Sequence, residues 1–521
     1  MILDYLDLIM FAVLFGSILL GYPVAFTIAG VGVLFALIGI TTGKFDIFLL
    51  GALSQRIFGI MTREVLIAIP LFVLMGLVLE RSRIAEDLLE EMARLFGSMK
   101  GGLGLSVVIV GALLAASTGI VGATVVTMAL IALPSMLRNG YSTSLAAGTV
   151  ATAGTLGQII PPSTLLIILS EVMSNGYQQA QIEAGKFTLE TISVGQMFAA
   201  ALFPGLMLVV VYIVYILVYA HLKPEVAPAM SRAGNDPVNW KRIGSTLMPP
   251  LVLIVAVLGS ILGGVASPTE AASVGAIGAI LLAGFRLSNG ASNKALALGS
   301  AALVIVIFIA GFMTVRLQKE VVGFAEYSTA LVIIILLGIA IFAIATSLLR
   351  MQKANLLAPI TTNTMTITSM IFVTIIAASV FSLVFIGIGG EERIQEIIKS
   401  MPGGAVGALL FVMVLVFVLG FFLDFVEISV ILLPIVVPTL ILMGHDPVWL
   451  AVLLAINLQT SFLTPPFGFS LFYLRGAAPK EVTTGQIYQG VAPYIVLQVL
   501  GMAVIWFWPD IATWLPRELY G

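Results

Sequence analysis

Two acidic residues stand inside an otherwise apolar run of the chain. Asp424 and Glu427 belong to the sequence GFFLDFVEIS, which is flanked by long stretches of Leu, Val and Ile. An ionisable side chain at membrane depth is costly and typically serves ion binding or proton transfer. We therefore predict an ion-linked role for Asp424 rather than a purely structural one. For Glu427, and for Glu270 in SPTEAA, helix capping is an equally good interpretation, because Ser267 precedes Glu270 as at a capped helix start.

Two prolyl-proline pairs interrupt apolar sequence elsewhere. Pro161-Pro162 and Pro465-Pro466 are surrounded by glycine, hydroxyl and amide residues in GTLGQIIPPS and NLQTSFLTPPFG. Proline lacks an amide hydrogen, so each pair breaks a helix, and the freed backbone groups inside a membrane must be satisfied by protein, water or an ion. The freed carbonyls can bind a cation, while the N-terminus of the next half-helix faces an anion. We favour this functional interpretation over a simple kink.

The same pattern occurs twice in the chain. A single offset of 304 residues pairs Pro134 with Pro438, Gly140 with Gly444, and Pro161-Pro162 with Pro465-Pro466. In both copies an apolar run leads into a polar turn before the break. Matched, proline-interrupted apolar segments in two halves of a chain are typical of the binding site of a secondary transporter.

A second irregular segment precedes each break. Residues 115–124, AASTGIVGAT, place small and polar residues between two apolar arms that are each too short to span a membrane. The offset maps residues 117–122 onto residues 421–426, which include Asp424. We predict a re-entrant helical hairpin in each half, with its tip against the broken helix. Close packing of small residues is an alternative for the first tip but not for the acidic second tip.

The composition requires a membrane around the chain. Of its 521 residues, 60% are hydrophobic and 10% are charged, and the mean hydropathy is +1.14, which is too apolar for a surface in water. We predict an all-α polytopic membrane protein with about a dozen spanning or half-spanning helices. The net charge of −2 argues against nucleic-acid binding, and the lack of cysteine excludes thiolate chemistry. No GxxxxGK[ST] phosphate-binding loop occurs.

Two segments outside the repeat organise the rest of the sequence. Residues 221–241, which contain three prolines, are predicted to link the two halves. Residues 84–96, IAEDLLEEMARLF, are apolar on one helical face and charged on the other, which predicts an amphipathic helix at the membrane surface. His221 and His445 stand beside polar loop sequence, and we expect them to be solvated rather than catalytic.

These motifs resemble the large membrane subunit of the tripartite ATP-independent periplasmic (TRAP) transporters, within the ion transporter superfamily. The resemblance rests on residues 113–163, 267–274 and 419–479 and on GYPVAF from Gly21, and these segments are spread over nearly the whole chain. The segments STGIVGATVV and NLQTSFLTPPFGF are most similar to the branch grouped under mannitol and chloroaromatic compounds, which implies 2-oxo acids, lactate or other monocarboxylates as substrates. Residues 286–350 match the family pattern less well.

The resemblance implies an inverted-repeat elevator transporter in the bacterial inner membrane, driven by Na⁺ and without a prosthetic group or a catalytic residue. It also implies two partners, which are a small four-helix membrane subunit and a periplasmic substrate-binding protein. Residues 1–102 would form N-terminal scaffold helices, 103–192 the first transport repeat, 193–404 a linker and further scaffold helices, 405–490 the second transport repeat, and 491–521 a C-terminal helix.

The resemblance also implies the site residues. One Na⁺ site would use the first tip and the first break, namely Ser117, Thr118, Gly119, Gly154, Thr155 and Pro161. The other would use the second tip and the second break, namely Asp424, Glu427, Gln459, Thr460 and Pro465. A carboxylate substrate would lie between them, held by half-helix N-termini and by Thr124, Gln158, Ser163 and Thr464.

Three alternatives stay open on sequence grounds. A stand-alone ion-coupled carboxylate carrier of the same superfamily would need no binding protein. An intramembrane enzyme would need a nucleophile with a base, or paired acids with metal ligands, and Asp424 with Glu427 is the only close acidic pair in apolar sequence. A passive channel would leave the matched breaks in the two halves without an explanation.

Overall fold

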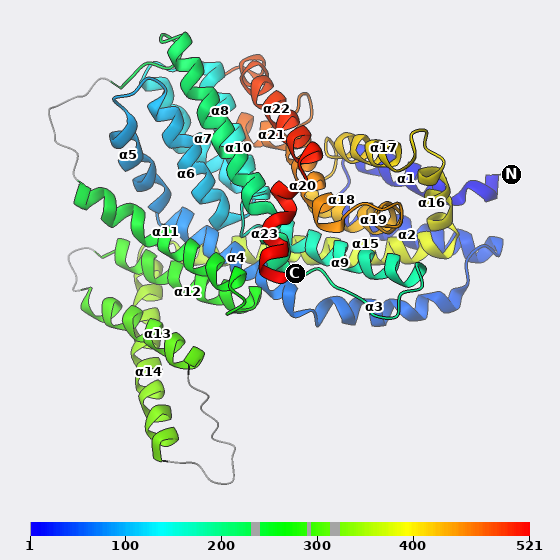
Figure 1. Cartoon of the computed structure of the whole chain (residues 1–521), viewed down its shortest axis with the longest axis horizontal. Helices are drawn as coiled ribbons and strands as arrows, with labels where there is room; N and C mark the ends of the chain where they lie inside the picture. Colours follow the sequence, from blue (N-terminus) through cyan, green and yellow to red (C-terminus); the bar gives the residue numbers. More distant parts are fainter. Residues whose placement is uncertain (1, 231–239, 289–292, 313–323) are drawn as a thin grey trace.

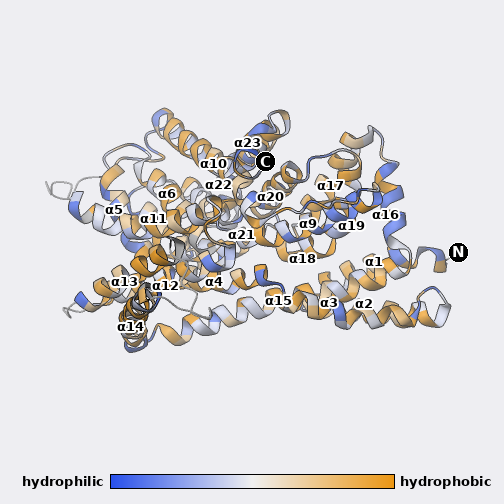
Figure 2. Cartoon of the chain, turned by 60° about the horizontal axis from the view of Figure 1, so that its bottom comes forward, coloured by the Kyte–Doolittle hydropathy of each residue, from blue (hydrophilic) through white to orange (hydrophobic). Residues whose placement is uncertain are grey.

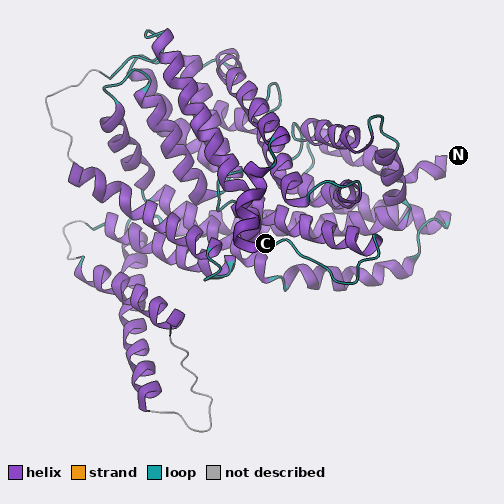
Figure 3. Ribbon diagram, viewed as in Figure 1, coloured by secondary structure: helices purple, strands orange, loops and turns teal. Residues whose placement is uncertain are grey.

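The protein, described by a computed structural model, is built from α-helices. No β-strand occurs among the described residues, which are 2–230, 240–288, 293–312 and 324–521 (Figure 3). Within these ranges the side chains of residues 2, 117, 118, 242, 310–312 and 325 are not described. Eight of the described helices are long and apolar enough to cross a membrane, or up to ten if two bent pairs each count as one span. The predicted all-α polytopic fold is confirmed.

The first half runs from the amino terminus to the predicted linker. Its helices are α1 (Leu6–Leu19), α2 (Val24–Thr42), α3 (Gly51–Met61), α4 (Glu64–Arg81), α5 (Ile84–Phe96), α6 (Gly102–Thr118), α7 (Val121–Arg138), α8 (Thr143–Thr155), α9 (Thr164–Glu183) and α10 (Val194–Leu222). Helices α3 and α4 are bent by 50° at their junction, so together they form one broken span. The predicted amphipathic helix is α5, and its described bounds are those predicted.

The second half follows the linker, of which residues 231–239 lie outside the described part. Its helices are α11 (Trp240–Leu262), α12 (Pro268–Arg286), α13 (Lys294–Phe312), α14 (Phe324–Lys353), α15 (Leu357–Gly387), α16 (Gly390–Lys399), α17 (Gly404–Leu419), α18 (Phe425–Ile431), α19 (Leu433–Leu442), α20 (Pro447–Leu463), α21 (Phe469–Ala477), α22 (Thr484–Phe507) and α23 (Asp510–Tyr520). Helices α13 and α14 pack on each other and project away from the rest of the chain (Figure 1). The two helices occupy most of residues 286–350, for which the sequence resemblance is weaker.

The repeat found in the sequence is present in the helix bounds. Residues 121 and 138, which bound α7, become 425 and 442 with the offset of 304, and these residues bound the α18–α19 pair. The start of α8 at residue 143 becomes 447, where α20 begins. Ser142 and Asp446, which also correspond, both cap these helices with their side chains. The two hairpins and the two broken helices are therefore equivalent elements.

The equivalent elements pack in a reciprocal way. Helix α7 of the first hairpin packs on α21, which follows the second break, while α18 and α19 of the second hairpin pack on α9, which follows the first break. Helix α22 lies directly against α8, because a Cβ atom at Gly490 would stand 1.9 Å from the Ser144 carbonyl oxygen. Hydrophobic residues predominate along the helices (Figure 2), as a bilayer requires.

Candidate ion and substrate site

The first broken helix has the interruption that the sequence predicts. Helix α8 ends at Thr155, a 3₁₀ turn follows over Leu156–Gln158, the Pro161-Pro162 bond is cis, and α9 begins at Thr164. The Ser163 hydroxyl donates to the Gln158 carbonyl oxygen at 2.8 Å, which closes the interruption into a short loop. The loop is buried throughout, so its polar groups depend on the protein or a ligand for partners.

The second broken helix repeats this arrangement with different side chains. Helix α20 ends at Leu463, the Pro465-Pro466 bond is cis, and α21 begins at Phe469. The hydroxyl of Thr464 donates to the Thr460 carbonyl at 2.7 Å, and the hydroxyl of Thr460 donates to the carbonyl of Ile456 at 2.7 Å. Both predicted broken helices are thus confirmed as structures.

The two breaks meet through residues at equivalent positions. The Gln459 Nε2 atom donates to the Thr155 hydroxyl oxygen at 3.3 Å, and residue 155 plus 304 is residue 459. The Thr155 hydroxyl in turn donates to the Thr152 carbonyl at 2.8 Å, so it serves as donor and acceptor at once. Two equivalent residues can touch only near the axis that relates the halves. The sequence assigned these residues to separate Na⁺ sites, and the structure brings them together.

The tip of the first hairpin lies on the first break. Gly119 joins α6 to α7 with a φ of +60°, and a Cβ atom there would stand 3.0 Å from the Thr164 backbone nitrogen. Both the conformation and the space therefore favour glycine. Gly154 is equally constrained, because its Cβ would come within 2.4 Å of Val125 on α7. The side chains of Ser117 and Thr118, predicted for the same Na⁺ site, lie outside the described part.

Unpaired polar atoms gather at this first break. Both amide atoms of Gln158 and the hydroxyl of Thr164 are fully buried and find no hydrogen-bond partner among the described residues. The starts of α7 and α9 also lack a described side-chain cap, and they lie close together, because a Cβ atom at Gly119 would stand 3.0 Å from the Thr164 backbone nitrogen. Thr124, another predicted substrate residue, is buried in the first turn of α7 and donates to the Ile120 carbonyl at 2.9 Å.

The second tip is closed by its own acidic residues. The Asp424 carboxylate accepts from the Phe425 backbone nitrogen at 2.7 Å, and the Asp424 backbone nitrogen donates to Glu427 Oε2 at 2.9 Å. This capping box starts α18. The capping interpretation of Glu427 is therefore confirmed, while the ion-linked role of Asp424 stays a prediction. Glu270 also forms a capping box, with Ser267 at the start of α12.

The residues predicted for the two Na⁺ sites offer mainly oxygen atoms as ligands. No group of three or more His, Asp or Glu side chains within the described ranges is arranged to hold a metal ion. A cation at the breaks would therefore rest on backbone carbonyl, hydroxyl, amide and single carboxylate oxygens. Hard cations such as Na⁺ prefer oxygen ligands of this kind, so the residues fit the predicted coupling ion.

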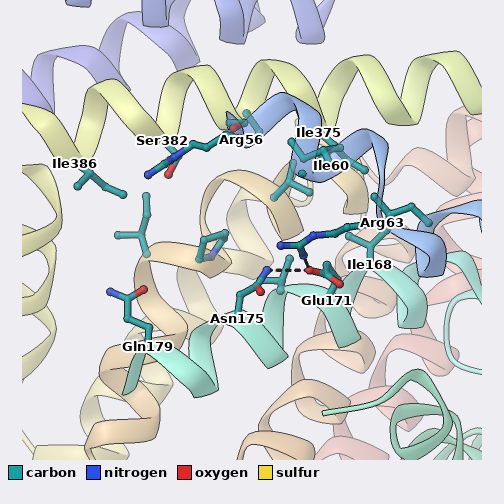
Figure 4. Close-up of a pocket in the computed structure, with 18 of the residues that line it drawn as sticks. Arg56, Ile60, Arg63, Ile168, Glu171, Asn175, Gln179, Ile375, Ser382 and Ile386 are labelled. Carbon is teal, nitrogen blue, oxygen red and sulfur yellow. Dashed lines mark hydrogen bonds and ion pairs between the residues drawn. The ribbon is translucent and has the colours of Figure 1, made fainter. Parts of the chain in front are cut away.

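A separate cleft of about 680 Å³ opens beside α9 (Figure 4). It lies between α3, α4 and α15 on one side and α9, α18 and α19 on the other, and none of its lining residues belongs to a break. Arg63 forms an ion pair across it with Glu171, which also accepts from Asn175 Nδ2 at 3.0 Å. Sequence reasoning missed this cleft, because its walls come from segments far apart in the chain.

Comparison with known proteins decides the family. The sequence matches the family described as "Tripartite ATP-independent periplasmic transporter, DctM component" over residues 11–296 and 286–511. The chain belongs to the DctM family. It is therefore the large permease subunit of a TRAP transporter, a multi-pass protein of the bacterial inner membrane and not an enzyme.

Several curated TRAP permeases are similar to the chain over nearly their whole length. The C4-dicarboxylate permease DctM of Vibrio cholerae is 26% identical over 522 residues, covering 98% of each chain. The ectoine permease TeaC of Halomonas elongata is 25% identical, covering 98% of this chain and 99% of its own. The sialic acid permease SiaM of Vibrio cholerae is 23% identical, covering 97% of each chain. Relatives of nearly equal identity thus carry names of three different substrates.

A solved transporter shares the fold of this TRAP permease. The YdaH transporter of Alcanivorax borkumensis aligns with a TM-score of 0.53 and 14% identity over 90% of this chain and 89% of its own.

Two side chains at the site escaped sequence reasoning. Thr164 follows the predicted substrate residue Ser163 directly and carries one of the unpaired hydroxyls. Tyr473 on α21 lies against the first hairpin, since a Cβ at Gly122 would stand 2.8 Å from its ring. Proximity to the break could have pointed to Thr164. The contact of Tyr473 depends on packing between the halves, for which the sequence has no signal.

Proposed function

We propose that this TRAP permease couples Na⁺ entry to uptake of a small organic acid of the monocarboxylate or 2-oxo acid type. A periplasmic binding protein delivers the substrate, and a small four-helix membrane subunit completes the transporter. Na⁺ binds at the two tips and breaks, and the substrate binds between them. The hairpins and broken helices carry substrate and ions together past a fixed scaffold.

One observation carries the proposal of an anionic substrate. At the first break, the uncapped starts of α7 and α9 converge beside the unpaired amide of Gln158 and the unpaired hydroxyl of Thr164. Helix N-termini carry partial positive charge and free N–H groups, which favour a carboxylate. Buried polar groups without partners are rare in proteins unless a ligand or water satisfies them.

The charge of the predicted binding residues bears on how many carboxylates the substrate carries. Thr124, Gln158, Ser163 and Thr464 are all uncharged, so the substrate's negative charge would be balanced by helix N-termini and by Na⁺. A second carboxylate would have to lie toward Asp424 and Glu427, where like charges repel. This asymmetry favours a substrate with one carboxylate.

The proposed moving unit is supported by the way its parts are joined. The hydrogen bond between Gln459 and Thr155 ties the two broken helices together, and each hairpin packs on the helix after the opposite break. These four elements therefore form one body. Helices α4 and α15 pack along it from the side where the 680 Å³ cleft opens, which is where a fixed scaffold would separate from the moving unit.

Uptake by proteoliposomes containing this chain and its small subunit tests the function. Labelled 2-oxo acids or lactate are supplied with candidate binding proteins, with and without an inward Na⁺ gradient. We expect uptake that needs both the gradient and a binding protein. Uptake that ignores the Na⁺ gradient would refute the coupling, and uptake without any binding protein would establish the alternative of a stand-alone carrier.

A matched pair of glutamine variants tests the site itself. Gln158→Leu removes the unpaired amide at the first break, and we expect it to weaken substrate uptake at least tenfold. Gln178→Leu removes an amide on the neighbouring helix α9 that bonds only to Ser174 among the described residues. Equal uptake by both variants would show that the first break does not hold the substrate.

A further inference from the structure

Helix α4 carries a polar contact to the proposed moving unit at each end. At its C-terminal end, Glu80 Oε1 accepts from the Thr127 hydroxyl of α7 at 2.6 Å. At its N-terminal end, Arg63, the residue before the helix, forms the ion pair with Glu171 of α9 (Figure 4). One helix of the scaffold is thus fastened to two helices of the first repeat. Any sliding between them must break both contacts.

Glu80 is only half satisfied in this position. Its Oε2 atom is buried and finds no partner among the described residues, and its other oxygen meets a neutral hydroxyl. A buried carboxylate with an unpaired oxygen is costly, and a cationic partner would stabilise it far better than a hydroxyl does. The contact therefore has the character of one resting position rather than of a permanent structural bond.

Helix α7 offers a cationic partner further along the same face. Arg138 is the only ionisable residue of α7, and it lies eleven residues after Thr127. At 100° per residue, eleven residues bring a side chain back to within about 20° of the same face, and at 1.5 Å per residue they span roughly 16 Å. In this structure the exposed Arg138 donates through Nε to the Pro134 carbonyl of its own helix at 3.3 Å.

We propose that Glu80 is a two-position latch, which holds Thr127 in this state and Arg138 after the moving unit has slid about three helical turns in the direction of the α7 axis. The ion pair between Arg63 and Glu171 opens in the same step. The proposal rests on the moving unit of the proposed function and adds to it a direction along α7, a register and the pair of residues that mark the second state.

The chain has no cysteine, so cross-linking of introduced cysteine pairs can test the latch directly without reaction at native thiols. Three double variants are prepared in the full chain, combining Glu80→Cys with Thr127→Cys, Arg138→Cys or Leu137→Cys. Each is treated in membranes with a short bifunctional thiol reagent, which traps even a minor state irreversibly over time. We expect the Thr127 pair to react first and the Arg138 pair to accumulate more slowly. Leu137 faces about 100° away from Arg138, so its pair should stay unlinked.

Each outcome of the trapping experiment either supports or refutes the proposed latch. A time-dependent link between positions 80 and 138, without one between 80 and 137, supports it. No link between 80 and 138 would overturn it, as would equal linking of both pairs. Because linking is read on gels, the outcome does not depend on uptake. If the wild-type protein shows no Na⁺-driven uptake, that result counts against the proposed function and not against the latch.

Exchange of the two charges supplies a functional measurement. Glu80→Arg and Arg138→Glu are each expected to slow initial uptake about fivefold, the size of effect that one ion pair supports. The double exchange should recover most of the rate, because the pair is restored in the second position. If the double variant is as slow as the product of the single effects, Glu80 and Arg138 do not meet during transport.

Discussion

The hydrogen bond between Gln459 and Thr155 is the only described side-chain bond that joins the two breaks, and it can be tested by removing each partner. Thr155→Val takes away the hydroxyl but keeps the shape of the side chain. Gln459→Leu removes the amide and keeps an apolar side chain of similar length. The double variant removes both polar groups, so no buried partner is left behind.

The expected magnitudes follow from the burial of both residues. Both are fully buried, so Thr155→Val leaves Gln459 Nε2 without a partner and should cost about 1–3 kcal/mol of unfolding free energy. Gln459→Leu should cost less, because Thr155 keeps its bond to the Thr152 carbonyl and Gln459 Oε1 has no described partner to lose. The double variant should fall short of the sum by about 0.6 kcal/mol, the average for hydrogen bonds between membrane helices, and by about 1.7 kcal/mol at most.

Unfolding in mixed micelles measures the coupling, and Na⁺-dependent uptake measures its consequence. Gln498→Leu is the matched control, because Gln498 is also fully buried, donates to the Tyr212 hydroxyl at 2.9 Å and has an unpaired Oε1. It lies on α22 outside the breaks, so we expect a similar loss of stability with unchanged Na⁺ dependence. Additive effects of Thr155→Val and Gln459→Leu would refute the view that this bond joins the two broken helices.

Two variants of Asp424 separate its structural role from its ionic role. Asp424→Asn keeps a good helix cap but removes the charge, whereas Asp424→Ala removes both; we expect Asn to retain stability yet lose Na⁺ dependence, and Ala to lose about 1 kcal/mol in addition. Unchanged Na⁺ dependence in Asp424→Asn would end the ion-linked assignment. Gly490→Ala should prevent α22 from packing on α8, because its Cβ would meet the Ser144 carbonyl at 1.9 Å; size-exclusion chromatography should show little monodisperse protein, while Gly485→Ala, where the space is open, should behave as wild type.

Local patterns in the sequence predicted the elements more accurately than their contacts. The amphipathic pattern of residues 84–96 corresponds to α5 residue for residue, and the prolyl-proline pairs mark both breaks. The offset of 304 relates α7 to the α18–α19 pair without a shift. These features depend on neighbours within a few turns, which sequence patterns report directly.

The contacts between halves could not be predicted in this way. That Thr155 meets Gln459 depends on where the axis between the halves passes, and many equivalent pairs would have satisfied the same offset. The bond from Thr127 to Glu80 joins residues 47 apart and is set by the position of the hairpin against α4. The capping box of Asp424 and Glu427 is different, because an acidic residue followed three residues later by Glu is a recognised helix start. Of these two residues, the sequence indicated capping only for Glu427.

The two hairpin tips have equivalent backbone elements, but they favour ligands of opposite charge. Ile120 and Asp424 occupy equivalent positions at the starts of α7 and α18. The N–H groups at the start of α18 are partly occupied by the capping box, whereas no described side chain occupies those of α7. A carboxylate is therefore favoured at the first tip and a cation at the second. Na⁺ at the first tip would then rely on the charge of the bound substrate, while Na⁺ beside Asp424 would bind in its absence. Loss of substrate-independent Na⁺ binding in Asp424→Asn is the result this asymmetry requires.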